Sequence, residues 1–218
     1  APPGIHGYVA GSAPQIADQF EVGNEGTVTV TLLTVGVIAL MLLIDARRAA
    51  RTDEAGELVL LEDQDRTGWD RAQIEEGRSL VVAALTGGQP GPYALQAAIA
   101  AVHDEAATVE TTDWVQIVGL YEALRETAPS PVVELNRAVA VAMVHGPAFG
   151  LRLLDDLAGA GLDQYHPLHA ARGRLLDRLG RYREAARAYR RALEFVGNEP
   201  ERAFLTRCLT TAEERALG

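Results

Sequence analysis

The sequence is short of several residue types on which whole classes of protein depend. It has one cysteine, Cys208, which excludes an internal disulfide and a cysteine-rich zinc site. It has no lysine, so all 20 basic residues are arginine. Aromatic residues make up only 6% of the chain, whereas alanine and leucine are abundant, and this composition favours helix over sheet. With a single thiol, the protein is expected to be cytoplasmic.

The charge balance is acidic and unevenly spread. The 218 residues carry 30 acidic and 20 basic side chains, a net charge of −10, so the chain is a poor free-standing partner for DNA or RNA. From residue 166 to the end there are 11 arginines and 7 acids, whereas the first 165 residues hold 9 arginines and 23 acids. With 48% apolar residues, the sequence predicts a globular protein of one or at most two domains, with a mildly basic C-terminal end.

The N-terminal part contains a long uncharged run. Residues 1–33 are predicted to be an irregular leader, which begins rich in Gly, Pro and Ala and lacks the basic region of a secretory signal. Residues 27–44 carry no charge, a length at the lower edge of what spans a bilayer. Because this run begins TVTVT and contains four threonines, a buried helix over about 34–49 is preferred, and a membrane-anchored regulator is the alternative.

Helical periodicity and capping signals fill the rest of the chain. Thr67 with Asp70 resembles a capping box, and Ser130 followed by Pro131 is typical of a helix start. Short connections predict that neighbouring helices pack antiparallel, so the fold class is all-α. The predicted helices cover about 68–85, 92–107, 112–127, 130–145, 147–158, 167–179, 181–196 and 199–215.

The second half of the chain shows internal self-similarity. Gly146 and Gly180 are 34 residues apart, which is the period of the tetratricopeptide helix–turn–helix repeat. In the last unit, Gly173 is expected to let two helices approach closely, and Ala185 and Tyr189 fall at small and aromatic positions of the second helix. The unit before it is degenerate. A generic helical bundle with accidental glycines is the alternative interpretation.

These patterns predict three parts: the leader over 1–33, a helical region over 34–111, and tetratricopeptide-like repeats with a C-terminal capping helix over 112–218. Helix pairs of this kind cannot bury their apolar faces alone, so they stack as a right-handed superhelix. The concave face of such a superhelix usually holds a peptide or another protein domain and rarely supplies catalytic groups.

Three features are candidate sites of chemistry. His166 and His169 form an i, i+3 pair that could face a metal ion, but no third ligand lies at a recognised spacing. Residues 63–68 begin like a calcium loop, but Ile74 stands where a bidentate glutamate is needed. Cys208 has Arg207 beside it, yet its helical spacing favours a buried structural thiol. No catalytic residue, cofactor or metal is therefore predicted, and a helical hydrolase or metal protein stays as the alternative.

Two charged stretches are candidate protein contacts. The arginines of the last unit could form a basic stripe whose partner would be an acidic protein rather than nucleic acid, because no aromatic residues for base stacking lie among them. The alternative is a solvated face paired with Glu184 and Glu194. The predicted protein-binding residues are Asp63, Asp65 and Arg66 in the acidic loop and Arg174, Arg178, Arg181 and Arg187 in the stripe.

Five long runs of the sequence are specific enough to identify a family. They are IALMLLIDARRAARTDEAGELVLLEDQDRTGWDR (38–71), GPYALQAAIAAVHDEA (91–106), TDWVQIVGLYEAL (112–124), SPVVELNRAVAVAM (130–143) and YHPLHAARGRLLDRLGR (165–181). These runs resemble the C-terminal extension of bacterial extracytoplasmic-function sigma factors that carry a tetratricopeptide-like domain. The resemblance covers about residues 38–216.

The resemblance implies a non-enzymatic role in transcription initiation. In that family, two N-terminal sigma regions bind core RNA polymerase and the promoter, and the extension is regulatory. The implied partners are therefore the sigma regions and core polymerase, with DNA reached only through the holoenzyme. No basic helix-turn-helix typical of sigma regions occurs in this sequence. A stand-alone protein-binding module with an unrelated partner is the alternative.

Overall fold

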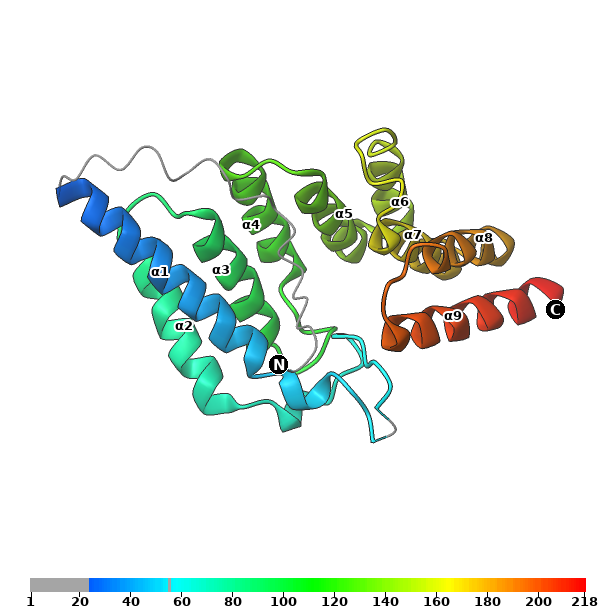
Figure 1. Ribbon diagram of the computed structural model, residues 1–218, viewed down its shortest axis with the longest axis horizontal. Helices are drawn as coiled ribbons and strands as arrows, with labels where there is room; N and C mark the ends of the chain where they lie inside the picture. The colour runs from blue at the N-terminus through cyan, green and yellow to red at the C-terminus, as the bar shows by residue number, and fades with distance from the viewer. Residues whose placement is uncertain (1–23, 55) are drawn as a thin grey trace.

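The computed structural model describes residues 24–54 and 56–218, and within them the protein is all-α (Figure 1), as the sequence predicts. Two short 3₁₀ helices, η1 (Arg48–Ala50) and η2 (Arg66–Gly68), lie in the long connection between the first two α-helices. The α-helices of this part of the chain are α1 (Asn24–Asp45), α2 (Arg71–Thr86), α3 (Pro92–Glu105), α4 (Trp114–Thr127), α5 (Pro131–His145), α6 (Pro147–Asp155), α7 (His166–Arg178), α8 (Tyr182–Leu193) and α9 (Glu199–Leu217).

The helix boundaries follow local capping chemistry. The Ser130 side chain accepts a hydrogen bond from the Val133 amide at 3.1 Å, which confirms the predicted start of α5. The predicted capping box at Thr67 is wrong: α2 begins after Asp70, whose carboxylate accepts from the Gln73 amide at 3.0 Å. Thr67 belongs instead to η2, because the Asp65 carboxylate accepts from both its amide and its hydroxyl group.

The uncharged run forms the outer part of a three-helix unit. Its helix starts at Asn24, so the expected irregular leader is wrong for residues 24–33, and residues 1–23 lie outside the described residues. The Leu32 side chain lies against Gly87 at the end of α2, and packing therefore continues N-terminal to the predicted start at residue 34.

Close approaches to α2 and α3 explain the orientation of α1. A Cβ atom on Gly36 would lie 2.9 Å from the backbone nitrogen of Ala94 in α3, so only glycine fits at this crossing. Leu43 is fully buried against Gly77 of α2, whereas Met41 on the other face of α1 is 65% exposed. Within the described chain, no helix, α1 included, combines the length and apolarity that a membrane crossing needs.

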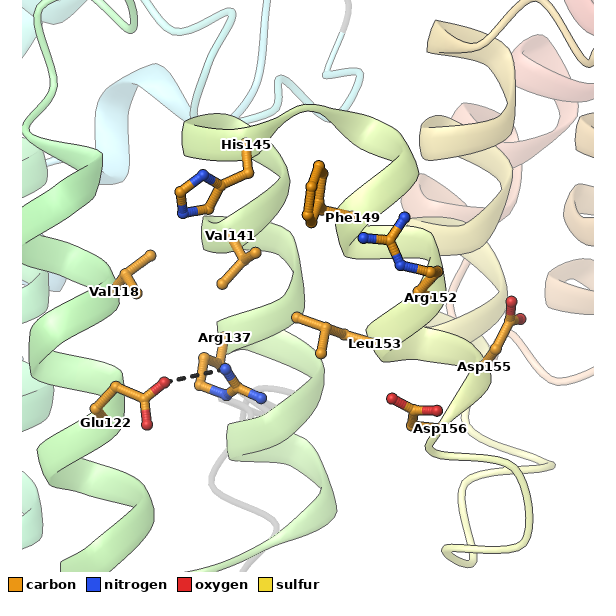
Figure 2. A pocket seen from close by; sticks show the side chains of 10 residues that line it. All are labelled: Val118, Glu122, Arg137, Val141, His145, Phe149, Arg152, Leu153, Asp155 and Asp156. Atoms are coloured by element: carbon orange, nitrogen blue, oxygen red, sulfur yellow. Dashed lines mark hydrogen bonds and ion pairs between the residues drawn. The ribbon is translucent and has the colours of Figure 1, made fainter.

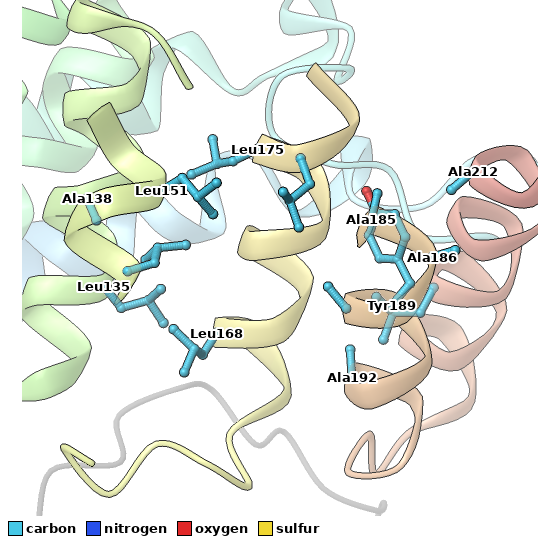
Figure 3. Close-up of a cluster of buried hydrophobic side chains, with 14 of the residues drawn as sticks. Leu135, Ala138, Leu151, Leu168, Leu175, Ala185, Ala186, Tyr189, Ala192 and Ala212 are labelled. Carbon is cyan, nitrogen blue, oxygen red and sulfur yellow. The ribbon is translucent and has the colours of Figure 1, made fainter. Parts of the chain in front are cut away.

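The remaining helices pack mainly against their neighbours along the chain. Leu95 and Ile99 of α3 share one buried cluster with Ile117 and Leu124 of α4, so packing continues across residues 111 and 112. A second cluster runs from α5 to α9 (Figure 3). Its labelled members are Leu135, Ala138, Leu151, Leu168, Leu175, Ala185, Ala186, Tyr189, Ala192 and Ala212.

The α7–α8 pair has the close contact that the sequence predicts. A Cβ atom on Gly173 would lie 2.6 Å from Cε1 of Tyr189, a ring that is almost wholly buried. Gly180 makes the intervening turn with a φ of +72°, a conformation that glycine adopts without strain.

The degenerate α5–α6 pair uses a different small residue. A Cβ atom on Gly150 would lie 2.5 Å from Cβ of Ala142 and 2.7 Å from the carbonyl oxygen of Ala138. The close approach therefore occurs one residue before Leu151, the position at which the repeat alignment expects a small side chain. Leu151 instead joins the buried cluster that spans α5 to α9.

Candidate functional site

A groove of about 550 Å³ lies across α4, α5 and α6 (Figure 2). It is open to solvent and mixes apolar and charged side chains. We call it the α4–α6 groove. Its lining residues are Val118, Glu122, Arg137, Val141, His145, Phe149, Arg152, Leu153, Asp155 and Asp156.

The break between α5 and α6 places aromatic side chains at one end of this groove. Gly146 has a φ of +92° and Pro147 follows it, so α5 must end and α6 restart within two residues. The rings of His145 and Phe149 consequently lie 5.8 Å apart (Figure 2). The Arg152 guanidinium lies 4.2 Å from the centre of the Phe149 ring, a cation–π contact. Phe149 is still 49% exposed, so an apolar anchor is left open to solvent.

An ion-pair network fixes the wall between α4 and α5. Arg137 on α5 lies 3.0 Å from Glu122 of α4 and 2.9 Å from Glu134. Arg125 adds a second contact to Glu122 at 2.7 Å. Because Arg137 is mostly buried and held by two carboxylates, its charge is neutralised within the protein. Arg137 is therefore not a free charge for a partner, and the charges that the groove can offer are those of its other lining residues.

Carboxylates dominate the opposite end of the groove. Asp155 at the end of α6 pairs with Arg172 of α7 at 2.6 Å, and Asp156 beside it is exposed. The apolar side chains Val118, Val141 and Leu153 line the space between this end and the Phe149 end (Figure 2). A groove of this kind suits a protein segment with both apolar and charged side chains.

The acidic loop contributes less to the surface than the sequence predicts. Asp63 is exposed, and Asp65 is exposed but serves as the cap of η2. The prediction for Arg66 as a surface contact is wrong, because this residue is only 5% exposed. Its Nη1 donates hydrogen bonds to the carbonyl oxygens of His103 and Ala106, both at 2.8 Å. Arg66 therefore joins η2 to the end of α3.

A buried charged cluster surrounds this residue. Asp104 is fully buried, and its carboxylate lies 3.5 Å from Nε of Arg47, just after α1. The guanidinium groups of Arg47 and Arg66 both lie over the ring of the buried Trp69, at 5.8 and 5.1 Å from its centre. Burial raises the pKa of Asp104 to about 6, against the opposing effect of the nearby arginines. The cluster joins α1, η2, α2 and α3 in one core.

The preceding residue, His103, has its pKa shifted in the opposite direction. Burial lowers the pKa of His103 to about 4, and the positive charges of Arg47 and Arg66 add to this shift. The His103 ring meets Trp114 of α4 edge-on with ring centres 5.1 Å apart. His103 is therefore a neutral packing residue at neutral pH.

The arginines of the predicted stripe have different environments in the structure. Arg181 makes a bidentate ion pair with Glu184 at 2.6 and 2.7 Å, which bears out the solvated-face alternative at this position. Arg187 lies on the exposed face of α8, opposite the buried residues of that helix. Arg174 on α7 is ion-paired with Glu62, so one end of the stripe contacts the acidic loop. No sequence pattern indicated that contact, because the two residues are 112 positions apart.

The residues considered for chemistry have structural partners. His166 pairs with Glu201 at 2.9 Å, and Nε2 of His169 lies 2.9 Å from the carbonyl oxygen of Asp163. Burial raises the pKa of the Cys208 thiol, as expected of a structural thiol. Over the described ranges, no three His, Cys, Asp or Glu side chains are grouped so that they could hold a metal ion.

Comparisons with known proteins give two similarities. The family model described as "Family of unknown function (DUF6596)" matches residues 27–85, which run from α1 into α2. An uncharacterized protein of Rhizobium meliloti (strain 1021) is 46% identical over 170 residues, which is 78% of this chain. The chain spans 40% of that relative's length. No solved structure matches the chain.

Sequence reasoning missed the α4–α6 groove. The sequence indicates the Gly146-Pro147 break, but its consequence for His145 and Phe149 was not predicted. The available signal was a phenylalanine two residues after a helix break and three before an arginine, in a chain poor in aromatic residues. The pairing of Glu122 with Arg137 gave no such signal, since it depends on how α4 and α5 pack.

Proposed function

We propose that this chain is a non-enzymatic regulatory domain of an alternative RNA polymerase sigma factor, which supports transcription initiation by contacting sigma regions or core polymerase. In this proposal α5–α9 form antiparallel pairs of a tetratricopeptide-like, right-handed superhelix, and the protein acts in the cytoplasm. The sigma-factor assignment rests on the sequence runs within residues 38–181, and the chain spanning 40% of its relative's length is consistent with one part of a longer protein.

The observation that carries the contact function is the α4–α6 groove. An exposed phenylalanine with an arginine stacked on it combines two residue types that are enriched at protein interfaces. Apolar side chains extend from it, and carboxylates lie at the other end, so the groove has a distinct polarity. A bound protein segment would contact the aromatic anchor, the apolar side chains and the carboxylates at the same time.

The Gly173–Tyr189 contact supports the repeat architecture. The contact joins the two helices across the turn at Gly180, as a 34-residue helix–turn–helix repeat requires, and the small residues Ala185 and Ala192 are fully buried. Each such pair depends on its neighbour to cover its apolar face, and α9 covers the last one.

A pull-down with variants of the full 218-residue chain tests the proposal. The immobilised chain is incubated at low salt with purified sigma regions or core polymerase from the source bacterium. We expect the wild-type chain to capture at least one of them. The double variant Phe149→Ala/Arg152→Glu should retain less than a tenth of it, because the anchor and its cation are both lost.

Leu217→Ala/Arg183→Glu is the matched control, since both of its sites are exposed and lie on α9 and α8. It removes an exposed apolar side chain and reverses one charge, as the test variant does, and should bind like the wild type. Capture of neither partner by the wild-type chain would contradict the sigma-factor assignment. Equal capture by both variants would contradict the role of the groove.

A further inference from the structure

The loop between η1 and η2 reaches from the N-terminal helices to the C-terminal ones. In Figure 1 it projects from the base of α1–α3 toward the start of α9. Its second part, residues 56–65 (GELVLLEDQD), carries four acidic side chains and no basic one. We call residues 56–65 the acidic strap.

Both glutamates of the strap pair with arginines, which lie on different helices. Glu62 pairs with Arg174 of α7, and Glu57 pairs with Arg207 of α9. The pairs span more than 100 residues of sequence, and each arginine side chain is still a third or more exposed. The strap therefore lies across α7 and α9 through charge pairs that solvent can reach.

The two arginines belong to one local surface, because their glutamate partners lie only five positions apart in the strap. Arg174 and Arg207 both favour the charged form of the Cys208 thiol and so lower its pKa, although burial has the larger, opposite effect. Arg178, one turn after Arg174, is exposed and donates a hydrogen bond to Sδ of Met143 at 3.2 Å. Within the described chain no carboxylate lies within 4 Å of it. We call Arg174, Arg178 and Arg207 the arginine surface.

The strap also has an apolar side. Leu60 and Leu61 are half-buried, and they line a hollow of about 280 Å³ with Tyr121, Val139 and other residues of α3, α4, α5 and α7. The strap therefore contacts the helices through leucine side chains as well as through carboxylates. Any other segment that binds in its place must carry both kinds of side chain.

We propose that the arginine surface is a docking site for an acidic, leucine-containing segment of a partner protein, and that the acidic strap occupies this site within the free chain. The carboxylates of the partner segment take the places of Glu57 and Glu62, and its leucines take the hollow of Leu60 and Leu61. Arg178 is a cation of this surface that the strap's carboxylates leave unpaired, and it is available to the partner.

Displacement of the strap is physically reasonable. Exposed ion pairs each contribute little to stability and are weakened by salt. The strap forms no helix or strand, and Thr52 and Leu58 make only an isolated bridge. Its advantage over a partner is its tether, which gives it a high effective concentration at the arginine surface.

A labelled peptide with the strap's own sequence, GELVLLEDQD, tests the proposal by fluorescence anisotropy. The full-length variant Glu57→Lys/Glu62→Lys should release the strap and bind the peptide at least tenfold more tightly than the wild type does. Glu76→Lys/Glu126→Lys makes the same change of net charge at exposed positions on α2 and α4, and should bind like the wild type. Equal affinity for the two variants would overturn the proposal.

Two further variants locate the binding surface. Arg174→Glu/Arg207→Glu should abolish peptide binding, because the cations are replaced by repelling charges. The fourfold variant, which combines these changes with Glu57→Lys/Glu62→Lys, swaps each pair and should again keep the strap in place, without peptide binding. Peptide binding by Arg174→Glu/Arg207→Glu that matches the released variant would overturn the assignment to the arginine surface.

Hydrogen exchange on the wild-type chain gives a test that needs no variant. The Val59 amide donates to the Arg51 carbonyl oxygen at 2.8 Å in the closed strap. Millimolar peptide should speed exchange in the strap while the helices keep their protection, and unchanged exchange at Val59 would overturn the proposal. Because the α4–α6 groove is a separate surface, failure here leaves the proposed sigma-factor contact untouched.

Discussion

At the residue scale, the neighbours His103 and Asp104 make opposite contributions to the pH dependence of stability. The pKa of Asp104 is raised from 3.8 to about 6, so its contribution is fully present below pH 3.8 and is lost as pH rises through 6. The pKa of His103 is lowered from 6.5 to about 4, so its contribution is present above pH 6.5 and is lost as pH falls through 4. Each amounts to up to about 3 kcal/mol, and in the wild type the two largely cancel.

Separating these two groups gives the first prediction. In His103→Gln the Asp104 contribution stands alone, so the free energy of unfolding should rise, relative to the wild type, as pH falls from 6.5 to 4.5. In Asp104→Asn it should instead fall over the same range. Urea denaturation of each protein at both pH values measures the two slopes. If both variants keep the wild-type slope, the buried cluster is not as described.

The second prediction concerns the α7–α8 crossing. Gly173→Ala introduces a methyl group 2.6 Å from the buried Tyr189 ring and should lower the free energy of unfolding by about 1–3 kcal/mol. Gly119 is exposed in the middle of α4, and a Cβ atom added there would meet nothing within 4 Å, so Gly119→Ala should stabilise by about 0.5–1 kcal/mol. Urea denaturation of both variants measures this difference in sign, and equal effects would contradict the close contact.

At the scale of elements, α1 is a helix with one buried and one exposed apolar face. Leu43 is fully buried against Gly77, and Leu43→Ala should destabilise by about 2–5 kcal/mol. Met41 is two positions away and 65% exposed, so Met41→Ala should change stability by less than about 0.5 kcal/mol. Thermal and urea unfolding compare the two variants. Similar losses would mean that α1 does not pack on α2 as described.

Sequence reasoning succeeded where structure is set by local chemistry. Ser130 caps α5, Pro92 begins α3 and Gly180 turns the chain, and each of these depends on residues within a few positions. It failed where a tertiary contact decides. The start of α1 at Asn24 goes with packing of Leu32 at Gly87, and the TVTVT run gives no sign of it.

The same division applies to the candidate sites. Arg66 was predicted to be on the surface because it lies in a charged loop, yet the carbonyl groups at the end of α3 bury it. Arg174 was selected as a basic surface residue, but its partner Glu62 could not be identified from spacing. Periodicity locates which residues share a helix face, whereas it cannot say which distant loop covers that face.

At the scale of the whole molecule, the described helices form an array with α1–α3 at one end, α7–α9 at the other and α4–α6 between them (Figure 1). The three buried clusters follow this order along the chain. Apolar packing therefore holds each part mainly to its neighbours. The α4–α6 groove lies at the middle of this array.

We propose that a protein of the transcription initiation machinery binds at the α4–α6 groove. Hydrogen exchange of the full chain, measured alone and with saturating sigma regions or core polymerase, tests it most directly. We expect slower exchange over residues 114–156, strongest near Phe149, and little change in α2. Binding that leaves residues 114–156 unchanged, or no binding of either partner, would contradict it.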